Sequence, residues 1–268
     1  MTDEDQTARW NGRAGNAWVD SQELLDKLLK PVEDVLVDAV AGPAVLDVGC
    51  GTGGTTVAVA RKVGTCVGVD ISGSMIAAAE KRAELAGVRA TFIRADAQDH
   101  DFEPGTFDTV ISRFGVMFFA DPVRAFTNLR RATRGGLCVV VWRGMDENPF
   151  MTTAERAAAP LLTLPVRLPD TPGQFGMASP DLVRGILTES GWADVDLEPL
   201  DVDFALPESE LVGYFTRLGP LGLALPEVDE TTRERVVETV RPAFDPYVHG
   251  AEVRFNGACW IVRATKGS

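Results

Sequence analysis

The chain has 268 residues, 45% of them hydrophobic and 24% charged, so it can bury a sizeable core and lies far from the composition of disordered chains. Its formal net charge of −13 argues against a nucleic-acid partner, because phosphate binding needs clustered Lys and Arg side chains. The four cysteines form no CxxC pair and have no histidines at zinc spacing, so we expect reduced, buried thiols and no metal site.

The first forty residues predict a helical arm. Apolar residues recur at helical spacing from Glu23 to Val40, with Pro31 expected to bend this helix. The stretch before it begins polar and acidic, and no window of the chain approaches 18 uninterrupted apolar residues. We therefore expect a cytoplasmic protein without a membrane partner.

Strands and helices alternate over the next hundred residues. The helix 122–133 is expected to end at Gly135 and Gly136. An alternation of this kind predicts a doubly wound, mostly parallel sheet with helices on both faces. The predicted strands span 44–48, 65–69, 91–94, 107–112 and 137–142, and the other predicted helices span 55–61 and 74–86.

The alternation breaks after Arg143, in a proline-rich stretch long enough to predict a lid. Ser179 and Pro180 then open a helix that ends at Gly191, strands follow at 195–200 and 258–264, and the segment 208–247 looks helical in two pieces. We expect one α/β domain over 1–268 with a seven-stranded sheet. Its predicted parts are an N-terminal arm (1–40), a cofactor-binding core (41–143), lid segments (144–178 and 205–250) and the rest of the sheet (179–204 and 251–268).

A glycine-rich turn after the first strand is the most informative local motif. It runs from Val45 to Gly54 with the sequence VLDVGCGTGG. Glycine lets the backbone approach a ligand closely, so the turn predicts a nucleotide-like ligand. Dinucleotide-binding folds carry a glycine-rich turn at the same place, so the turn alone does not distinguish a dinucleotide from another nucleotide-like ligand.

Three acidic residues at strand ends narrow the choice of ligand. Asp47 lies two residues before Gly49, where a carboxylate would repel a pyrophosphate but favour a cationic ligand. Asp70 ends the second strand, where it can accept hydrogen bonds from ribose hydroxyls. Asp96 follows the third strand, near the expected position of an adenine amino group. Together the acids predict an adenosyl ligand with a positive end.

These motifs resemble those of class I S-adenosylmethionine-dependent methyltransferases, in the ubiquinone/menaquinone-biosynthesis-like (methyltransferase type 11) group. The resemblance covers residues 40–143 and implies a Rossmann-like fold, with S-adenosyl-L-methionine as cofactor and S-adenosyl-L-homocysteine as product. The residues that it places against the cofactor are Asp47, Gly49, Cys50, Gly51, Thr52, Gly53, Asp70, Ile71, Met75, Asp96, Ala97, Arg113, Trp18 and Arg13.

The acceptor site has no recognisable local motif. The apolar lid suggests a small hydrophobic or aromatic acceptor, methylated on oxygen or carbon rather than nitrogen. Displacement at a sulfonium needs no obligatory general base, and His249 and Arg143 are the candidates for a catalytic role. Expected pocket residues are Trp10, Met117, Phe118, Trp142, Phe150 and Phe175.

Two other functions remain open from the sequence. A nicotinamide-dependent oxidoreductase would have no reason to keep Asp47. A non-catalytic cofactor-binding or regulatory protein with the same fold is compatible with every motif, because methyl transfer demands few catalytic side chains. A monomer and a homodimer are equally compatible with the sequence.

Overall fold

A mixed eight-stranded sheet forms the centre of the described part of the chain. The computed structural model describes residues 3–165, 167 and 171–267. Residues 1–2 of the predicted arm and residues 166 and 168–170 of the predicted lid lie outside the described residues. The strand order is β3-β2-β1-β4-β5-β8-β6, with a short β7 paired to β8. The expected α/β class with a mostly parallel sheet is confirmed.

The five parallel strands carry the sequence motifs at their carboxyl ends. β1 is buried along its whole length, which explains its apolar run, because a parallel strand is covered on both faces. The strands run parallel in the order β3 (Ala90–Arg94), β2 (Cys66–Asp70), β1 (Val45–Val48), β4 (Phe107–Arg113) and β5 (Thr133–Trp142).

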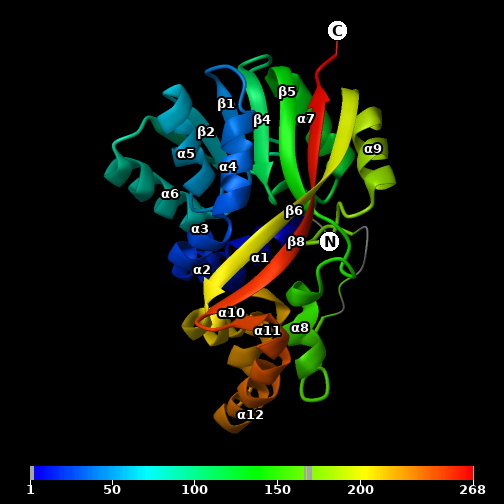
Figure 1. The fold of residues 1–268 in the computed structure, drawn as a ribbon. Helices are drawn as coiled ribbons and strands as arrows, with labels where there is room; N and C mark the ends of the chain where they lie inside the picture. Colours follow the sequence, from blue (N-terminus) through cyan, green and yellow to red (C-terminus); the bar gives the residue numbers. More distant parts are fainter. Residues whose placement is uncertain (1–2, 166, 168–170, 268) are drawn as a thin grey trace.

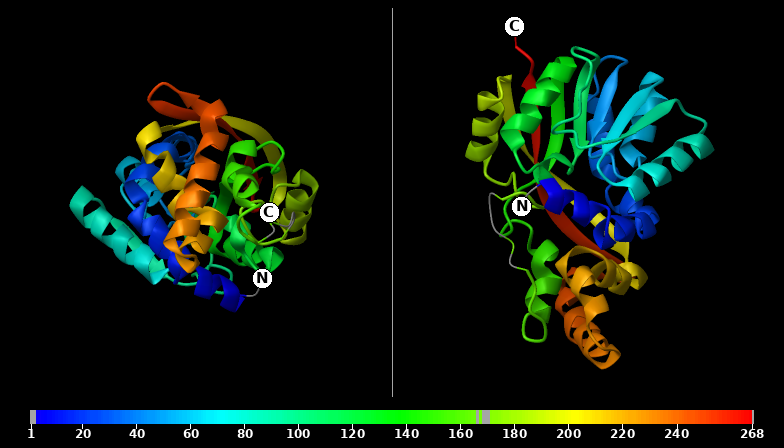
Figure 2. Two further views of the ribbon diagram at one scale, coloured as in Figure 1. Left: turned by 90° about the horizontal axis from the view of Figure 1, so that it is seen from below. Right: turned by 180° about the vertical axis from the view of Figure 1, so that it is seen from behind.

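Helices cover both faces of the sheet (Figure 2). One face carries α4 (Lys30–Ala39), α5 (Gly54–Val63) and α6 (Gly73–Ala86). The other carries α7 (Pro122–Ala132) and α9 (Pro180–Glu189), and α9 begins at the predicted Ser179 cap, whose hydroxyl accepts from the Leu182 amide. The four cysteines are all free and buried, as predicted.

Two long antiparallel strands continue past the sheet. β6 (Ala193–Pro207) and β8 (Glu252–Thr265) pair from Ala193 with Thr265 to Pro207 with Glu252. In Figure 1 this ribbon runs from the sheet down to a separate group of helices. It therefore ties that helical group to the sheet.

We call this helical group, together with the N-terminal helices, the cover. Its elements lie beyond the carboxyl ends of the parallel strands (Figure 1). They are α1 (Asp3–Trp10), α2 (Arg13–Asp20), α3 (Gln22–Leu28), α8 (Pro149–Ala158), η2 (Glu208–Glu210), α10 (Leu211–Arg217), α11 (Gly219–Ala224), η3 (Leu225–Glu227), α12 (Glu230–Val240), η4 (Arg241–Tyr247) and β7 (Val248–His249). No helix within the described ranges is long and apolar enough to cross a membrane.

Two predicted boundaries were wrong for local reasons. The helix expected over 23–40 is broken at Leu29 into α3 and α4, and Pro31 lies in the first turn of α4, where its missing N–H is tolerated. Gly135 and Gly136 lie inside β5 instead of ending a helix. A Cβ on Gly135 would lie 2.1 Å from the carbonyl oxygen of Asp108, so these glycines allow close strand contact.

Candidate active site

A cavity of about 270 Å³ lies between the carboxyl ends of the parallel strands and the cover. From the strand ends it is lined by Gly49, Gly51, Asp70, Asp96 and Arg113. From the cover it is lined by side chains of α1, α2, α8, α10 and α11. Ligands bind at this edge of open α/β sheets, so the cavity lies where the sequence motifs predict it.

The glycine turn is held against its neighbours by backbone contacts. The amides of Gly49 and Cys50 donate to the carbonyl oxygen of Val69, at 2.9 and 3.1 Å. Gly49 has a φ of +66°, and a Cβ there would lie 2.7 Å from the Cα of Gly115. Around Gly51, by contrast, the nearest atom to a built Cβ is the Met75 sulfur at 3.7 Å. The backbone of the turn is therefore open to the cavity at Gly51, whereas at Gly49 it packs closely against Gly115.

The Asp70 carboxylate is fixed at the end of β2. Its Oδ2 accepts from the Gly51 amide at 2.8 Å, and its Oδ1 accepts from the Ser72 amide at 2.9 Å. Burial raises the pKa of Asp70, although these backbone donors oppose the shift. Ile71 and Met75, which follow it along the chain, also line the cavity.

Asp96 and Ala97, the residues predicted to face adenine, line the cavity after β3. The Oδ1 of Asp96 accepts from the Gln98 amide at 2.9 Å, which closes a tight turn. The side chain of Gln98 in turn accepts from the Asp121 amide at 2.8 Å. This chain of contacts fixes the edge at which an adenine ring was predicted.

Asp47 does not line the cavity, so the expected direct contact with a ligand is not what the structure shows. Its carboxylate is 1% exposed and accepts from the Thr56 hydroxyl at 2.6 Å. Burial raises the pKa of Asp47 to about 7, and the hydrogen bond from Thr56 and the charge of Arg113 oppose this rise. Arg113 does line the cavity, and its Nη1 is buried without a hydrogen-bond partner among the described residues. Asp47 thus lies behind the cavity wall, bonded to Thr56 and within the electrostatic influence of Arg113.

The backbone is strained at the carboxyl end of β4, on the cavity edge of the sheet. Phe114 has a φ of +62°, which is uncommon for a non-glycine residue. Its ring stacks on Trp142 with centroids 4.2 Å apart, and its amide donates to the carbonyl oxygen of Val140. Both rings line the cavity. The strained turn therefore forms the wall between the strand ends and the cover.

The N-terminal arm is fixed to the sheet by Asn11, a residue that the sequence reasoning missed. Its Nδ2 donates to the carbonyl oxygen of Ile71 at 3.0 Å, and its Oδ1 accepts from the Gly73 amide at 3.0 Å. Trp10 and Trp18 flank it and line the cavity. The predicted place of Arg13 against the cofactor is not seen in this structure, where Arg13 pairs with Glu227 at the surface and does not line the cavity.

The cover supplies an aromatic chamber. Of the predicted pocket residues, Trp10, Met117, Phe118, Trp142 and Phe150 line the cavity. Phe175 does not; it is buried beneath the Arg167 guanidinium, 5.6 Å from its ring centroid. Further lining residues come from segments without a motif, and only their position in the fold could have revealed them: Gln6, Arg9, Glu155, Arg167, Tyr214, Phe215, Leu221, Leu223 and Phe244.

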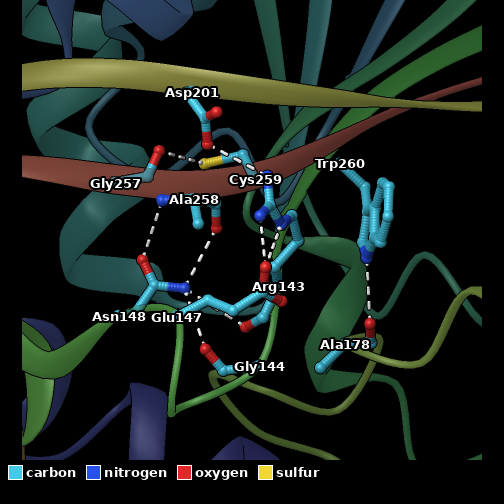
Figure 3. Close-up of polar contacts among 10 residues, drawn as sticks. All are labelled: Arg143, Gly144, Glu147, Asn148, Ala178, Asp201, Gly257, Ala258, Cys259 and Trp260. Atoms are coloured by element: carbon cyan, nitrogen blue, oxygen red, sulfur yellow. Dashed lines mark hydrogen bonds and ion pairs between the residues drawn. The ribbon is translucent and has the colours of Figure 1, made fainter.

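Neither catalytic candidate reaches the cavity. Figure 3 shows Arg143 bound to Glu147 and to Asp201, 3.0 Å from Nη1 to Oδ1. Its guanidinium also lies 5.4 Å from the centroid of the Trp260 ring. His249 is exposed on β7. Arg143 therefore braces the connection into the cover, and His249 lies at the surface.

Beside Arg143, Asn148 is buried and fixes the start of α8. Its Nδ2 lies 3.0 Å from the carbonyl oxygen of Ala258, and its Oδ1 accepts from the Ala258 amide at 2.9 Å (Figure 3). The remaining predicted cofactor residues, Cys50, Thr52 and Gly53, lie in the glycine turn but do not line the cavity. No cluster of metal-ligating side chains occurs within the described ranges.

The fold and the strand-end motifs agree with comparisons to known proteins. Residues 45–136 match the family model of a methyltransferase domain. Residues 45–136 therefore form a methyltransferase domain, and their strand-end motifs are those of the class I type, which uses S-adenosylmethionine as cofactor.

The most similar regions of curated relatives cover part of each protein. An uncharacterised protein of Mycobacterium tuberculosis is 33% identical over 52% of this chain and 53% of its own length. A ubiquinone/menaquinone biosynthesis C-methyltransferase of Bdellovibrio bacteriovorus is 34% identical over 38% of this chain and 45% of its own. An aklanonic acid methyltransferase of a Streptomyces species is 34% identical over 45% of this chain and 60% of its own. The chain spans about half the length of the curated relatives that it matches.

Solved structures share the fold at low sequence identity. A phosphoethanolamine N-methyltransferase of Haemonchus contortus has a TM-score of 0.61 and 17% identity, covering 100% of this chain and 61% of its own. The [4+2]-cyclase SpnF has a TM-score of 0.57 and 17% identity, covering 95% of each chain. Because a cyclase shares this fold, the fold alone does not define the reaction.

Proposed function

We propose that the protein transfers the methyl group of S-adenosylmethionine to oxygen or carbon of a small, largely apolar or aromatic acceptor. The observation that carries this proposal is a continuous cavity that joins the strand-end motifs to the aromatic chamber of the cover. One end carries the polar groups suited to an adenosyl amino acid. The other end is lined by aromatic and aliphatic side chains suited to an apolar acceptor.

The residues at the strand ends fit this cofactor. The Asp70 carboxylate is half-buried and lines the cavity, where it can accept from ribose hydroxyls. Gly51 leaves its backbone open to the cavity. The buried Nη1 of Arg113 has no hydrogen-bond partner among the described residues, and the carboxylate of an amino acid would satisfy it. Asp70, Gly51 and Arg113 would thus hold the ribose and the methionine end.

The chain's own contribution to the chemistry is positioning. When bound, the cofactor supplies a methyl group on a sulfonium, which is a good leaving group. The described cavity lining includes no histidine, and burial raises the pKa of Tyr214 to about 12, so this phenol is a poor base near neutral pH. Holding the acceptor in line within an apolar, water-poor chamber can supply much of the acceleration. The proposed reaction therefore relies on positioning, with neither a histidine nor Tyr214 acting as general base.

Calorimetric titration with S-adenosylmethionine, S-adenosylhomocysteine and NADH tests the cofactor assignment. We expect both adenosyl ligands to bind and NADH to fail. Asp70→Ala should weaken S-adenosylhomocysteine by about 1–3 kcal/mol, because it removes charge-assisted acceptors. Asp101→Ala, whose exposed side chain pairs with Arg131, is the matched control and should bind normally. Binding of NADH alone would overturn the proposal.

Methyl transfer itself is tested with radiolabelled cofactor against a panel of phenols, quinols, aromatic acids and polyketide-like enols. Transfer to an oxygen or carbon of at least one class is expected. Tight binding of the adenosyl ligands without transfer to any of them would instead favour a cofactor-binding protein with a different role.

A further inference from the structure

An unsatisfied polar cluster lies on the cover side of the cavity, away from the strand ends. Gln6 and Arg9 come from α1, three residues apart and hence on the same face of the helix. Gln6 is 5% exposed, lines the cavity, and neither atom of its side-chain amide has a hydrogen-bond partner among the described residues. A buried amide left unpaired costs stability, so its retention points to a ligand that pairs with it.

Arg9 presents a second unsatisfied group beside Gln6. Its Nε is buried without a partner within the described ranges, and its guanidinium lies 5.5 Å from the centroid of the Trp10 ring and 5.7 Å from that of Phe118. Burial lowers the pKa of Arg9, and the neighbouring charge of Arg167 lowers it further. A positive charge held in this way between aromatic rings suits an aromatic ligand with an anionic group.

Among the ion pairs between described residues, none involves Arg9. Glu155 lines the same chamber, but its carboxylate accepts from the Nε of Arg167 at 2.9 and 3.1 Å. Arg167 is held further by Gln174. The charged residues on this side of the described cavity lining are therefore Arg9, Arg217 and Glu155 from the cover and Arg167 from the segment after α8. A chamber with excess positive charge stands out in a chain whose formal net charge is −13.

We propose that Gln6 and Arg9 form a recognition site for an ionised oxygen group on the methyl acceptor, which makes the acceptor an acidic aromatic or polyketide-like molecule. This inference rests on the proposed function. The Arg9 guanidinium pairs with the anionic oxygen, the Gln6 amide donates a second hydrogen bond, and the rings of Trp10 and Phe118 contact the apolar body.

Matched ligand pairs test this site without knowledge of the natural acceptor. The probes are 2-naphthoate with 2-naphthamide and salicylate with salicylamide, each titrated into protein saturated with S-adenosylhomocysteine. We expect at least one acid to bind about tenfold more tightly than its amide, as one charge-assisted pair allows. Equal or undetectable binding of acids and amides would overturn the inference.

Substitutions then assign the preference to α1. Arg9→Met should reduce the acid preference to within about twofold while S-adenosylhomocysteine binds as in the wild type. Arg233→Met, an exposed arginine of α12 outside the cavity lining, is the matched control and should keep the preference. An acid preference that survives in Arg9→Met overturns the proposal, as does an equal loss of S-adenosylhomocysteine, which would assign Arg9 to the cofactor.

Gln6 gives an independent readout. Gln6→Met replaces the unpaired amide with an apolar side chain of similar length. The ligand-free protein should therefore unfold at a higher temperature, while the acid binds several-fold more weakly. A lower unfolding temperature together with unchanged acid binding would mean that Gln6 is structural. Loss of S-adenosylhomocysteine binding by the wild type would instead remove the proposed function itself.

Discussion

The two ends of the cavity are built in different ways. The strand-end side takes its residues from short turns that each follow a strand, so Gly51, Asp70 and Asp96 appear in the chain as compact motifs. The cover side takes single residues from helices far apart in the sequence, such as Gln6, Tyr214 and Phe244. A parallel sheet brings motifs together by topology, whereas a helical cover can change its lining one residue at a time. The family match at 45–136 covers the first side and not the second.

A substitution of Gly49, on the strand-end side of the cavity, should have the largest effect on ligand binding and stability. In Gly49→Ala the new Cβ would lie 2.7 Å from backbone at Gly115, in addition to the strain of a positive φ. We expect loss of measurable S-adenosylhomocysteine binding by calorimetry and destabilisation of roughly 2–4 kcal/mol in urea unfolding.

Gly87→Ala is the control for strain alone. Gly87 has a φ of +62°, close to that of Gly49, but nothing lies within 4 Å of a built Cβ. It should cost about 1–2 kcal/mol and leave ligand affinity unchanged. Equal behaviour of the two variants would mean that the contact between the β1 and β4 turns does not shape the site.

Removal of the Asn148 side chain, which connects the cover to the sheet, should have the next largest effect on stability. Asn148→Ala removes a buried amide that bonds both backbone groups of Ala258, so we expect a loss of about 2–4 kcal/mol in stability. Hydrogen exchange should increase in α8, while S-adenosylhomocysteine affinity changes little. Thr152→Ala on the same helix, where the hydroxyl donates only to the Pro149 carbonyl oxygen, should exchange like the wild type. Unchanged exchange in Asn148→Ala would show that other contacts hold the cover.

The sequence predicted the strand-end side better than the cover for a physical reason. The turn at Gly49 and the acids Asp70 and Asp96 are local signals that need only the order of strands. Gln6 and Arg9 carry no such signal, because their importance comes from burial against residues far away in the sequence, such as Phe118. Asp47 shows that sequence-based prediction is incomplete even at the strand ends. Its position was predicted, but only the structure shows that it is bonded to Thr56 and influenced by the charge of Arg113.

The long ribbon was missed although its signal is present in the sequence. β6 was expected to end at Leu200, yet the alternation of buried Val202, Phe204 and Leu206 with exposed neighbours continues to Pro207. Asp203, Ala205 and Pro207 lie on the exposed face, and β8 supplies the pairing. Recognition of this period of two would have shortened the predicted lid.

The buried acid behind the glycine turn should give the protein a pH-dependent stability. The pKa of Asp47 is raised to about 7 in the folded state, above its value in the unfolded chain. Its contribution is therefore fully present below about pH 4 and is lost as pH rises through 7. Urea unfolding from pH 4 to 8 should show a shallower decline for Asp47→Asn than for the wild type.

Asp108 provides a control of opposite sign. The Ala44 amide and Arg134 lower the pKa of Asp108, so its contribution is present above the unfolded value and is lost as pH falls. Asp108→Asn should thus weaken the protein chiefly near neutral pH and leave the decline between pH 4 and 7 in place. The same pH profile for wild type and Asp47→Asn would contradict the assignment.

Substitution of Arg13 should have the smallest effect on stability and ligand affinity. The sequence and the structure disagree about whether this residue contacts the cofactor. The sequence resemblance assigned Arg13 to the cofactor, whereas the structure shows it paired with Glu227, with side chains 60% and 65% exposed. An exposed pair of this kind contributes little, so Arg13→Ala should change stability by less than about 1 kcal/mol. Its S-adenosylhomocysteine affinity, measured by calorimetry, should match the wild type. A tenfold loss of affinity would mean that Arg13 leaves Glu227 when the cofactor binds, and the N-terminal arm would then close over the ligand as the cavity fills.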